Sequence, residues 1–196
     1  MEQPLDHAVN RATPLSFGVY VTSDPDHNPI DPPERFTGYH VGLDYEVSRD
    51  ELEQDVPVYA ICSGTVAYSG SAEGYGGLLI QRCTIDGQDA TVLYGHLSSS
   101  DLPHTGADLS AGERIGLLAP ARSGDSGGNR KHLHLGIHRG TEIETLGYVQ
   151  TEGEIAQFLD PKVALPRGIN QVLGRSLTPY WQQPENATPR ARASAN

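Results

Sequence analysis

The chain has 196 residues and a formal net charge of −11, with 14 Lys and Arg against 25 Asp and Glu. This acidic balance argues against nucleic acids and anionic membrane surfaces as partners, because both require a basic face on the protein. The sequence has no apolar run of roughly 18 residues, the length that a membrane-spanning helix needs. It therefore predicts no membrane span.

Residues 1–35 are rich in Pro and Asp and contain one β-like run, at residues 17–22. We interpret them as an N-terminal extension made of a strand and a Pro/Asp-rich connection. Its first residues, Met1–Asp6, offer neither a basic nor an apolar stretch, so no signal peptide is visible.

From residue 38 to about residue 148 the pattern changes to short β-branched or aromatic runs separated by glycines. Of the 22 glycines, 15 lie between residues 60 and 140, a distribution typical of strands and turns rather than helices. Strands are predicted at residues 39–47, 56–63, 65–69, 78–84, 90–96, 114–118 and 132–138.

Two capping-box patterns predict short helices, Ser48-x-x-Glu51 and Thr151-x-x-Glu154, the second helix ending at Asp160–Pro161. Beyond Pro166 the chain has few apolar anchors, and we expect a C-terminal tail over residues 166–196 that is partly disordered. The sequence thus predicts one mainly β domain, residues 36–165, with an arm at each end.

The two cysteines, Cys62 and Cys83, lie in runs that can form a hairpin across Gly70–Tyr75. In the simplest register of that hairpin the two thiols face each other, so a cross-strand disulfide is possible and would fit an envelope or extracellular compartment. Two buried, reduced thiols in neighbouring strands are an equal alternative.

Histidines in two predicted strands indicate a functional site. Side chains alternate along a strand, so His40, Gly42 and Asp44 share one face. By the same alternation His132, His134 and His138 share one face of a second strand, opposite an apolar face. If these faces meet, they supply His, Asp and His, which suit zinc and leave a fourth position for water. A solvated polar face is the alternative for each motif alone, but both motifs together, with Tyr94-Gly95-His96-Leu97 at a third strand end, argue against coincidence.

These motifs resemble those of the lysostaphin/LytM-type zinc metallopeptidases, the β-lytic enzymes that cut peptides in bacterial peptidoglycan. The matching runs follow the family's order across roughly residues 36–162: His40 to Asp44, Gly64-Thr65-Val66, Tyr75-Gly76, Tyr94 to Leu97, Gly112 to Gly116 and His132 to His134. The resemblance implies a mainly β fold, a single antiparallel β-sheet domain with short helices and long loops around a zinc cleft.

Position by position, the resemblance implies one Zn²⁺ per chain bound by His40, Asp44 and His134, with His96 and His132 as catalytic residues flanking the metal-bound water. It also implies a monomeric endopeptidase of the cell envelope, periplasmic or secreted, acting on peptidoglycan stem or cross-bridge peptides. Which of His96 and His132 is the base stays open, as does the choice between glycine bridges and D-alanyl cross-links. The rival hypothesis is a non-catalytic envelope protein that binds peptidoglycan or activates another hydrolase; such relatives typically lose metal ligands, whereas all five residues are present here.

Overall fold

A computed structural model describes residues 1–31 and 33–165. The predicted tail, residues 166–196, lies outside these described residues. Among them, no helix is long and apolar enough to cross a membrane.

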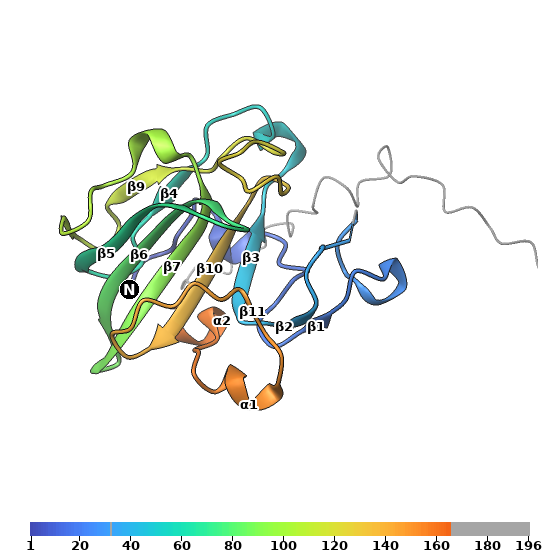
Figure 1. The fold of residues 1–196 in the computed structure, drawn as a ribbon. Helices are drawn as coiled ribbons and strands as arrows, with labels where there is room; N and C mark the ends of the chain where they lie inside the picture. The colour runs from blue at the N-terminus through green and yellow to red at the C-terminus, as the bar shows by residue number, and fades with distance from the viewer. Residues whose placement is uncertain (32, 166–196) are drawn as a thin grey trace, which may run out of the picture.

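A six-stranded antiparallel sheet forms the body of the domain (Figure 1). Its strands, in spatial order, are β3 (Gly42–Glu46), β10 (His132–Arg139), β7 (Gln88–Leu97), β6 (Gly76–Ile85), β5 (Gly64–Ala72) and β8 (Asp108–Leu109). The expected mainly β, antiparallel fold is confirmed, although two smaller sheets accompany the main one. These are β1 (Tyr20–Val21), β2 (Gly38–His40) and β11 (Tyr148–Val149), and the pair β4 (Pro57–Tyr59) and β9 (Arg114–Leu117).

The predicted single strand over residues 39–47 is wrong in one respect. It divides at Val41 into β2 and β3, which belong to different sheets. The Val41 amide donates to the carbonyl of Gly147, outside the strand ladders. Because of this break, His40 enters the site from the small sheet while Asp44 belongs to the large one.

The helices are short, as predicted. Both capping boxes form, at the 3₁₀ helix Arg49–Glu51 and at α1 (Glu152–Ile155). Asp160–Pro161, interpreted as a helix stop, instead begins α2 (Pro161–Ala164), because the Asp160 carboxylate accepts from the Lys162 amide and Pro161 occupies the first turn. Further 3₁₀ turns lie at Ala8–Asn10, Pro25–His27 and Ser99–Asp101.

The N-terminal segment packs into the main hydrophobic core. Leu5 and Ala8 are buried in the cluster that contains Leu133, Leu135 and Ile137, the apolar face of β10. Arg11 fixes the same segment to the domain, since its guanidinium donates to both carboxylate oxygens of Glu51 at 2.6 and 2.8 Å. The segment therefore shares its packing with the sheet.

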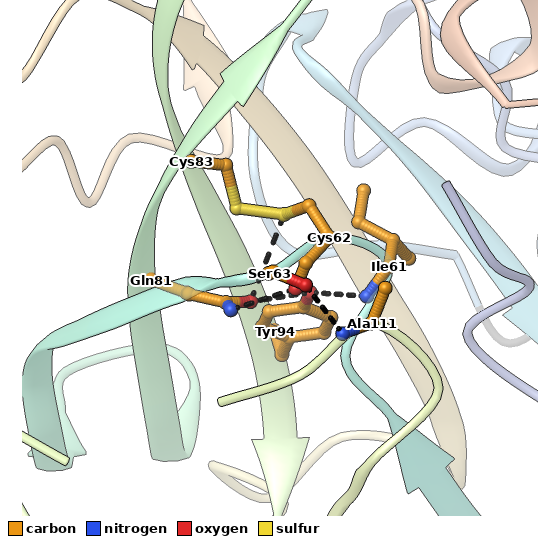
Figure 2. The surroundings of a disulfide bond; sticks show 7 residues. All are labelled: Ile61, Cys62, Ser63, Gln81, Cys83, Tyr94 and Ala111. Atoms are coloured by element: carbon orange, nitrogen blue, oxygen red, sulfur yellow. Dashed lines mark hydrogen bonds between the residues drawn. A yellow bond between two sulfur atoms is a disulfide. The ribbon is translucent and has the colours of Figure 1, made fainter. Parts of the chain in front are cut away.

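Cys62 and Cys83 form a disulfide, with their Cα atoms 6.2 Å apart (Figure 2). The simple hairpin register was wrong: β5 continues to Ala72, which pairs with Gly76, and after a β-bulge between Val66 and Tyr68 this register places Gly64, not Cys62, opposite Cys83. Cys62 reaches its partner from the segment before β5. A buried amide supports that segment, because the Gln81 side chain donates to the Cys62 carbonyl at 2.9 Å.

Candidate metal centre

Strand pairing places three of the predicted site residues close together on the neighbouring strands β3 and β10. In β10, His134 lies directly opposite Asp44 of β3 and, on its other side, opposite Gly95 of β7. His132, two residues earlier, lies opposite Glu46. The central position of β10 between β3 and β7 is visible in Figure 1. The alternation predicted from sequence therefore holds, and the ladder adds the register that aligns the histidines with Asp44.

His40, Asp44 and His134 converge on one point. The Nε2 atom of His40 lies 3.0 Å from Nδ1 of His134 and 3.3 Å from Oδ1 of Asp44. Nδ1 of His134 lies 3.0 Å from that same Oδ1 atom. All three side chains are buried, so two imidazole nitrogens and one carboxylate oxygen form a small triangle shielded from solvent.

This triangle fits a divalent metal ion. Two ligand atoms bound to one tetrahedral zinc at about 2.0–2.2 Å lie about 3.3–3.6 Å apart. The observed separations of 3.0–3.3 Å are close to that spacing. Two imidazoles and a carboxylate are also a donor set that zinc accepts while keeping a fourth position open. The arrangement could therefore hold a metal ion.

Gly42 provides the space that His134 needs. A Cβ atom at this position would lie 2.4 Å from Cε1 and 2.5 Å from Nε2 of the His134 imidazole, too close for any side chain. The glycine between the two residues of the His-x-Gly-x-Asp motif therefore leaves room for the third member of the triangle.

The N-terminal segment orients His40. Its Nδ1 atom lies 3.3 Å from the carbonyl oxygen of Ser16, so an Nδ1–H donor there leaves Nε2 unprotonated and facing the triangle. A carbonyl partner behind a metal-binding imidazole typically fixes its tautomer and ring orientation. Sequence analysis did not anticipate Ser16, because a backbone carbonyl leaves no side-chain signature.

His96 occupies a β-bulge at the end of β7. Gly77 pairs with Leu97 and Leu78 pairs with Gly95, so His96 has no partner in the ladder. Its φ of 63° is unusual for a residue with a side chain, and such a bulge re-aims a side chain. The ring turns inward, where Nδ1 lies 3.0 and 2.9 Å from the carbonyl oxygens of Tyr75 and Ser126.

The electrostatics of the two flanking histidines differ. Burial, together with nearby His132, holds the pKa of His96 well below its usual value, so His96 is neutral. The imidazole of His132 contacts an acceptor at each nitrogen: Nδ1 lies 3.0 Å from the Arg130 carbonyl, and Nε2 lies 3.2 Å from Oδ2 of Asp44. The rings of His96 and His132 lie 4.3 Å apart, centroid to centroid.

Asp44 stays ionised despite its burial. Desolvation alone would raise its pKa, but the electrostatic influence of His132 and His40, together with hydrogen bonds from His132 and His134, holds the pKa well below its usual range. The guanidinium of Arg130 adds a hydrogen bond of 2.7 Å to Oδ2 of Asp44. Oδ1 thus faces the two histidines of the triangle and Oδ2 faces Arg130 and His132.

The site opens into a cleft of about 270 Å³. Tyr75, Tyr148 and Phe36 contribute aromatic walls, and Glu34 and Glu73 contribute carboxylates. The Tyr75 hydroxyl is buried and has no hydrogen-bond partner among the described residues, and burial raises its pKa. His138, a further histidine on the β10 face, packs on Phe158 instead.

Sequence reasoning missed Arg130, Glu46 and Glu34. The first two were within reach, because each extends an alternation already recognised: residues 40, 42, 44 and 46 in one run, and 130, 132 and 134 in the other. Glu34 has no such local signal and meets the site only through the fold.

The family model for Peptidase family M23 matches residues 38–145 of the chain. The chain belongs to peptidase family M23. This match covers more than half of the residues and includes His40, Asp44, His96, His132 and His134. No curated protein matches the chain in a sequence comparison.

Two solved structures of lysostaphin share the fold of this M23 peptidase. The catalytic domain of the antimicrobial peptidase lysostaphin from Staphylococcus simulans is 20% identical, with a TM-score of 0.54 over 83% of this chain and 97% of that one. The longer lysostaphin structure matches with the same identity and TM-score over 93% of this chain and 57% of that one. Csd3 from Helicobacter pylori is 19% identical with a TM-score of 0.47, covering 76% of this chain, which spans about a third (34%) of Csd3.

Proposed function

We propose that this M23 family member is a zinc-dependent endopeptidase that hydrolyses peptide bonds in the stem or cross-bridge peptides of peptidoglycan, as a monomer in the cell envelope or outside the cell. The observation that carries the proposal is the convergence of His40, Asp44 and His134 beside a cleft, with His96 and His132 next to them. The disulfide supports an oxidising compartment.

His40, Asp44 and His134 would hold the zinc ion. Such an ion polarises a carbonyl as a Lewis acid and lowers the pKa of water, which is the chemistry that peptide hydrolysis needs. Asp44 supplies the single carboxylate of the triangle; despite its burial, the neighbouring histidines hold its pKa well below the usual range, and Arg130 donates a hydrogen bond to Oδ2.

His96 is suited to accept a proton. Its Nδ1–H can donate to the carbonyls of Tyr75 and Ser126 at 3.0 and 2.9 Å, an arrangement that selects the tautomer with a free lone pair on Nε2. A neutral, buried imidazole with a free nitrogen meets the requirement of a general base. The proposal therefore assigns proton abstraction to His96.

His132 is suited to carry and deliver a proton. With Nδ1–H on the Arg130 carbonyl, a second proton on Nε2 is stabilised by Oδ2 of Asp44 at 3.2 Å. An imidazolium held this way can stabilise an oxyanion or protonate the departing amine. We assign that role to His132, so that His96 accepts a proton and His132 donates one.

The activity is tested by mass spectrometry of fragments released from purified peptidoglycans of two cross-link types, with and without a chelator. We expect cleavage that the chelator abolishes, with fragment masses that identify the bond. A protein that binds zinc yet releases no fragment from either wall would favour the non-catalytic alternative.

The roles of the histidines are tested by comparing His40→Ala with His132→Ala. His40→Ala removes a ligand and should lose zinc and activity together. His132→Ala should keep most of its zinc while turnover falls by about 10²–10⁴-fold, the usual contribution of a general acid or base. Metal content by atomic emission and turnover on the same samples decide the matter. Equal zinc loss in both variants would make the assignment of His132 wrong.

A further inference from the structure

One buried guanidinium contacts the carboxylate of the triangle and two further carboxylates beside it. Arg130 is 3% exposed and donates to Asp44 Oδ2 at 2.7 Å, to Glu46 through Nε and Nη2 at 2.7–3.1 Å, and to Glu34 through Nη1. Its partners Asp44, Glu46 and Glu34 are themselves buried. A planar guanidinium presents its donors in a fixed fork, so three anchors leave it little rotational freedom.

The contact with Asp44 is specific to one oxygen. Arg130 and His132 contact Oδ2, whereas His40 and His134 contact Oδ1. A partial rotation of the carboxylate about its Cβ–Cγ bond would break the charged hydrogen bond to Arg130 and move the opposite oxygen away from the two histidines. The guanidinium thereby holds Oδ1 toward the two histidines.

The charges in this cluster also support a role for Arg130 in metal binding. Three acidic side chains share one guanidinium in this buried cluster, so acidic groups outnumber the basic group beside the triangle, an environment that suits a cation. Unpaired buried charges are costly, so a group that sets the position of these carboxylates also governs how well they accept a cation.

On the basis of the proposed metal-dependent function, we infer that Arg130 is a positioning residue. Its guanidinium holds Asp44 in its metal-binding orientation and connects it through Glu34 to the wall of the cleft. It touches neither substrate nor metal in this assignment. Its effect is exerted through Asp44.

The test is zinc affinity, measured by competition with a chromogenic chelator on full-length apoprotein, together with the visible spectrum of the cobalt-substituted form. Arg130→Gln should bind zinc about 10–100-fold more weakly, the usual cost of losing a partner behind a metal ligand. Its cobalt bands should also shift, because the ligand field reports how Asp44 is oriented. Neither readout depends on cleavage of peptidoglycan.

Arg11→Gln is the matched control. Arg11 is likewise buried, at 6% exposure, and is paired with a carboxylate, Glu51, while its other contacts are backbone carbonyls. It should lose stability but keep the zinc affinity and cobalt spectrum of the wild type. This separates a local role in the metal site from a general loss of folding energy.

Arg130→Lys distinguishes geometry from charge. Lysine keeps the positive charge but not the fork, so we expect its zinc affinity to stay well below that of the wild type. Recovery of wild-type affinity in Arg130→Lys, or wild-type or tighter zinc binding in Arg130→Gln, would overturn the inference. If neither variant folds, Glu34→Gln carries the test, with a several-fold weaker affinity expected and an unchanged affinity contradicting it. A wild-type protein that binds no zinc would instead contradict the proposed function.

Discussion

The imidazole of His134 fits into the sheet because the residues beside it on both flanking strands are glycines. Gly42 on one side and Gly95 on the other carry no side chain, and a Cβ atom at Gly95 would lie 3.5 Å from Cβ of His134 and 2.4 Å from the Tyr75 ring. The two strands that flank β10, namely β3 and β7, thus each leave space for the imidazole of His134. The imidazole of His134 and the ring of Tyr75 fill it, with their centroids 5.3 Å apart.

Gly42→Ala should damage the metal centre without touching any donor atom. The new methyl group would overlap the His134 imidazole and lie 2.9 Å from the Leu135 carbonyl. Overpacking of this kind typically costs about 1–3 kcal/mol of stability, and the displaced ring should weaken zinc binding by about tenfold or more. Calorimetric unfolding and zinc titration measure the two effects. Gly124→Ala, where nothing lies within 4 Å, is the control and should be neutral; equal behaviour of the two variants would contradict the steric argument.

The sequence predicts the side chains that form this site better than it predicts the groups that hold them in place. Alternation in two runs was enough to place His40 with Asp44 and His132 with His134, because strand periodicity is local. The carbonyl of Ser16 and the carboxylate of Glu34 arrive from distant segments and carry no periodic signal. The inward turn of His96 depends on a bulge, and a single sequence does not reveal where a ladder gains a residue.

At the scale of elements, bulges and breaks account for the errors in prediction. Most strands lie in predicted runs, but β8 and β11 were not predicted, and the run 56–63 forms a strand only at Pro57–Tyr59. The division at Val41 and the continuation of β5 to Ala72, with its bulge between Val66 and Tyr68, changed the expected pairing. Both depend on hydrogen-bond partners elsewhere in the chain. Capping boxes, by contrast, are closed within four residues, and both formed as predicted.

Replacing both cysteines by serine should destabilise the fold while sparing the metal site. The disulfide closes a loop across a sequence separation of 21 residues, for which chain entropy gives about 3 kcal/mol. Denaturant unfolding of the double variant, with and without reductant for the wild type, measures this value. Reduced wild type should match the double variant, and a large fall in zinc affinity in either would show that the bond also shapes the site.

The pair Arg11–Glu51 should make stability depend on pH. Burial alone would raise the pKa of Glu51, but hydrogen bonds from Arg11 and from the Ser48 amide lower it below its ordinary value. A carboxyl whose pKa is lower in the folded state stabilises the fold above its unfolded pKa of about 4.3 and loses this contribution as the pH falls.

Glu51→Gln tests this expectation. At pH 7 the variant should be less stable than wild type by about 1–3 kcal/mol, as for other hydrogen bonds to charged groups. The difference should shrink as the pH falls below the ordinary glutamate pKa of about 4.3 and through the lower pKa of Glu51 in the folded protein. Unfolding free energies across this pH range give the comparison. A difference that stays constant with pH would show that the charge of Glu51 contributes nothing.

At the scale of the whole molecule, the segment matched by the family model is smaller than the packed unit. Residues 38–145 exclude Leu5 and Ala8 of the main core, Arg11 and the Ser16 carbonyl behind His40. They also exclude β11, whose Tyr148 pairs with His40. The interpretation of residues 1–35 as an extension remains a prediction, to be tested by truncation.

Deleting residues 1–16 should abolish cooperative unfolding rather than release an active core. The deletion exposes the main core that Leu5 and Ala8 cover, removes Leu15 from a smaller apolar cluster, and leaves His40 without its carbonyl partner. Near-ultraviolet circular dichroism and thermal melting of the shortened chain are the measurements. A shortened protein that melts cooperatively and binds zinc like the wild type would support the extension as a separate arm.

The position of β10 also governs the order of events as the protein folds. The donors of the triangle are far apart along the chain, 94 residues between His40 and His134 and 90 between Asp44 and His134. They meet only when β10, the last strand of the large sheet to emerge during synthesis, inserts between β3 and β7. A chain in which β10 has not yet paired therefore lacks the triangle, and an ion could be taken up there only once the sheet is complete.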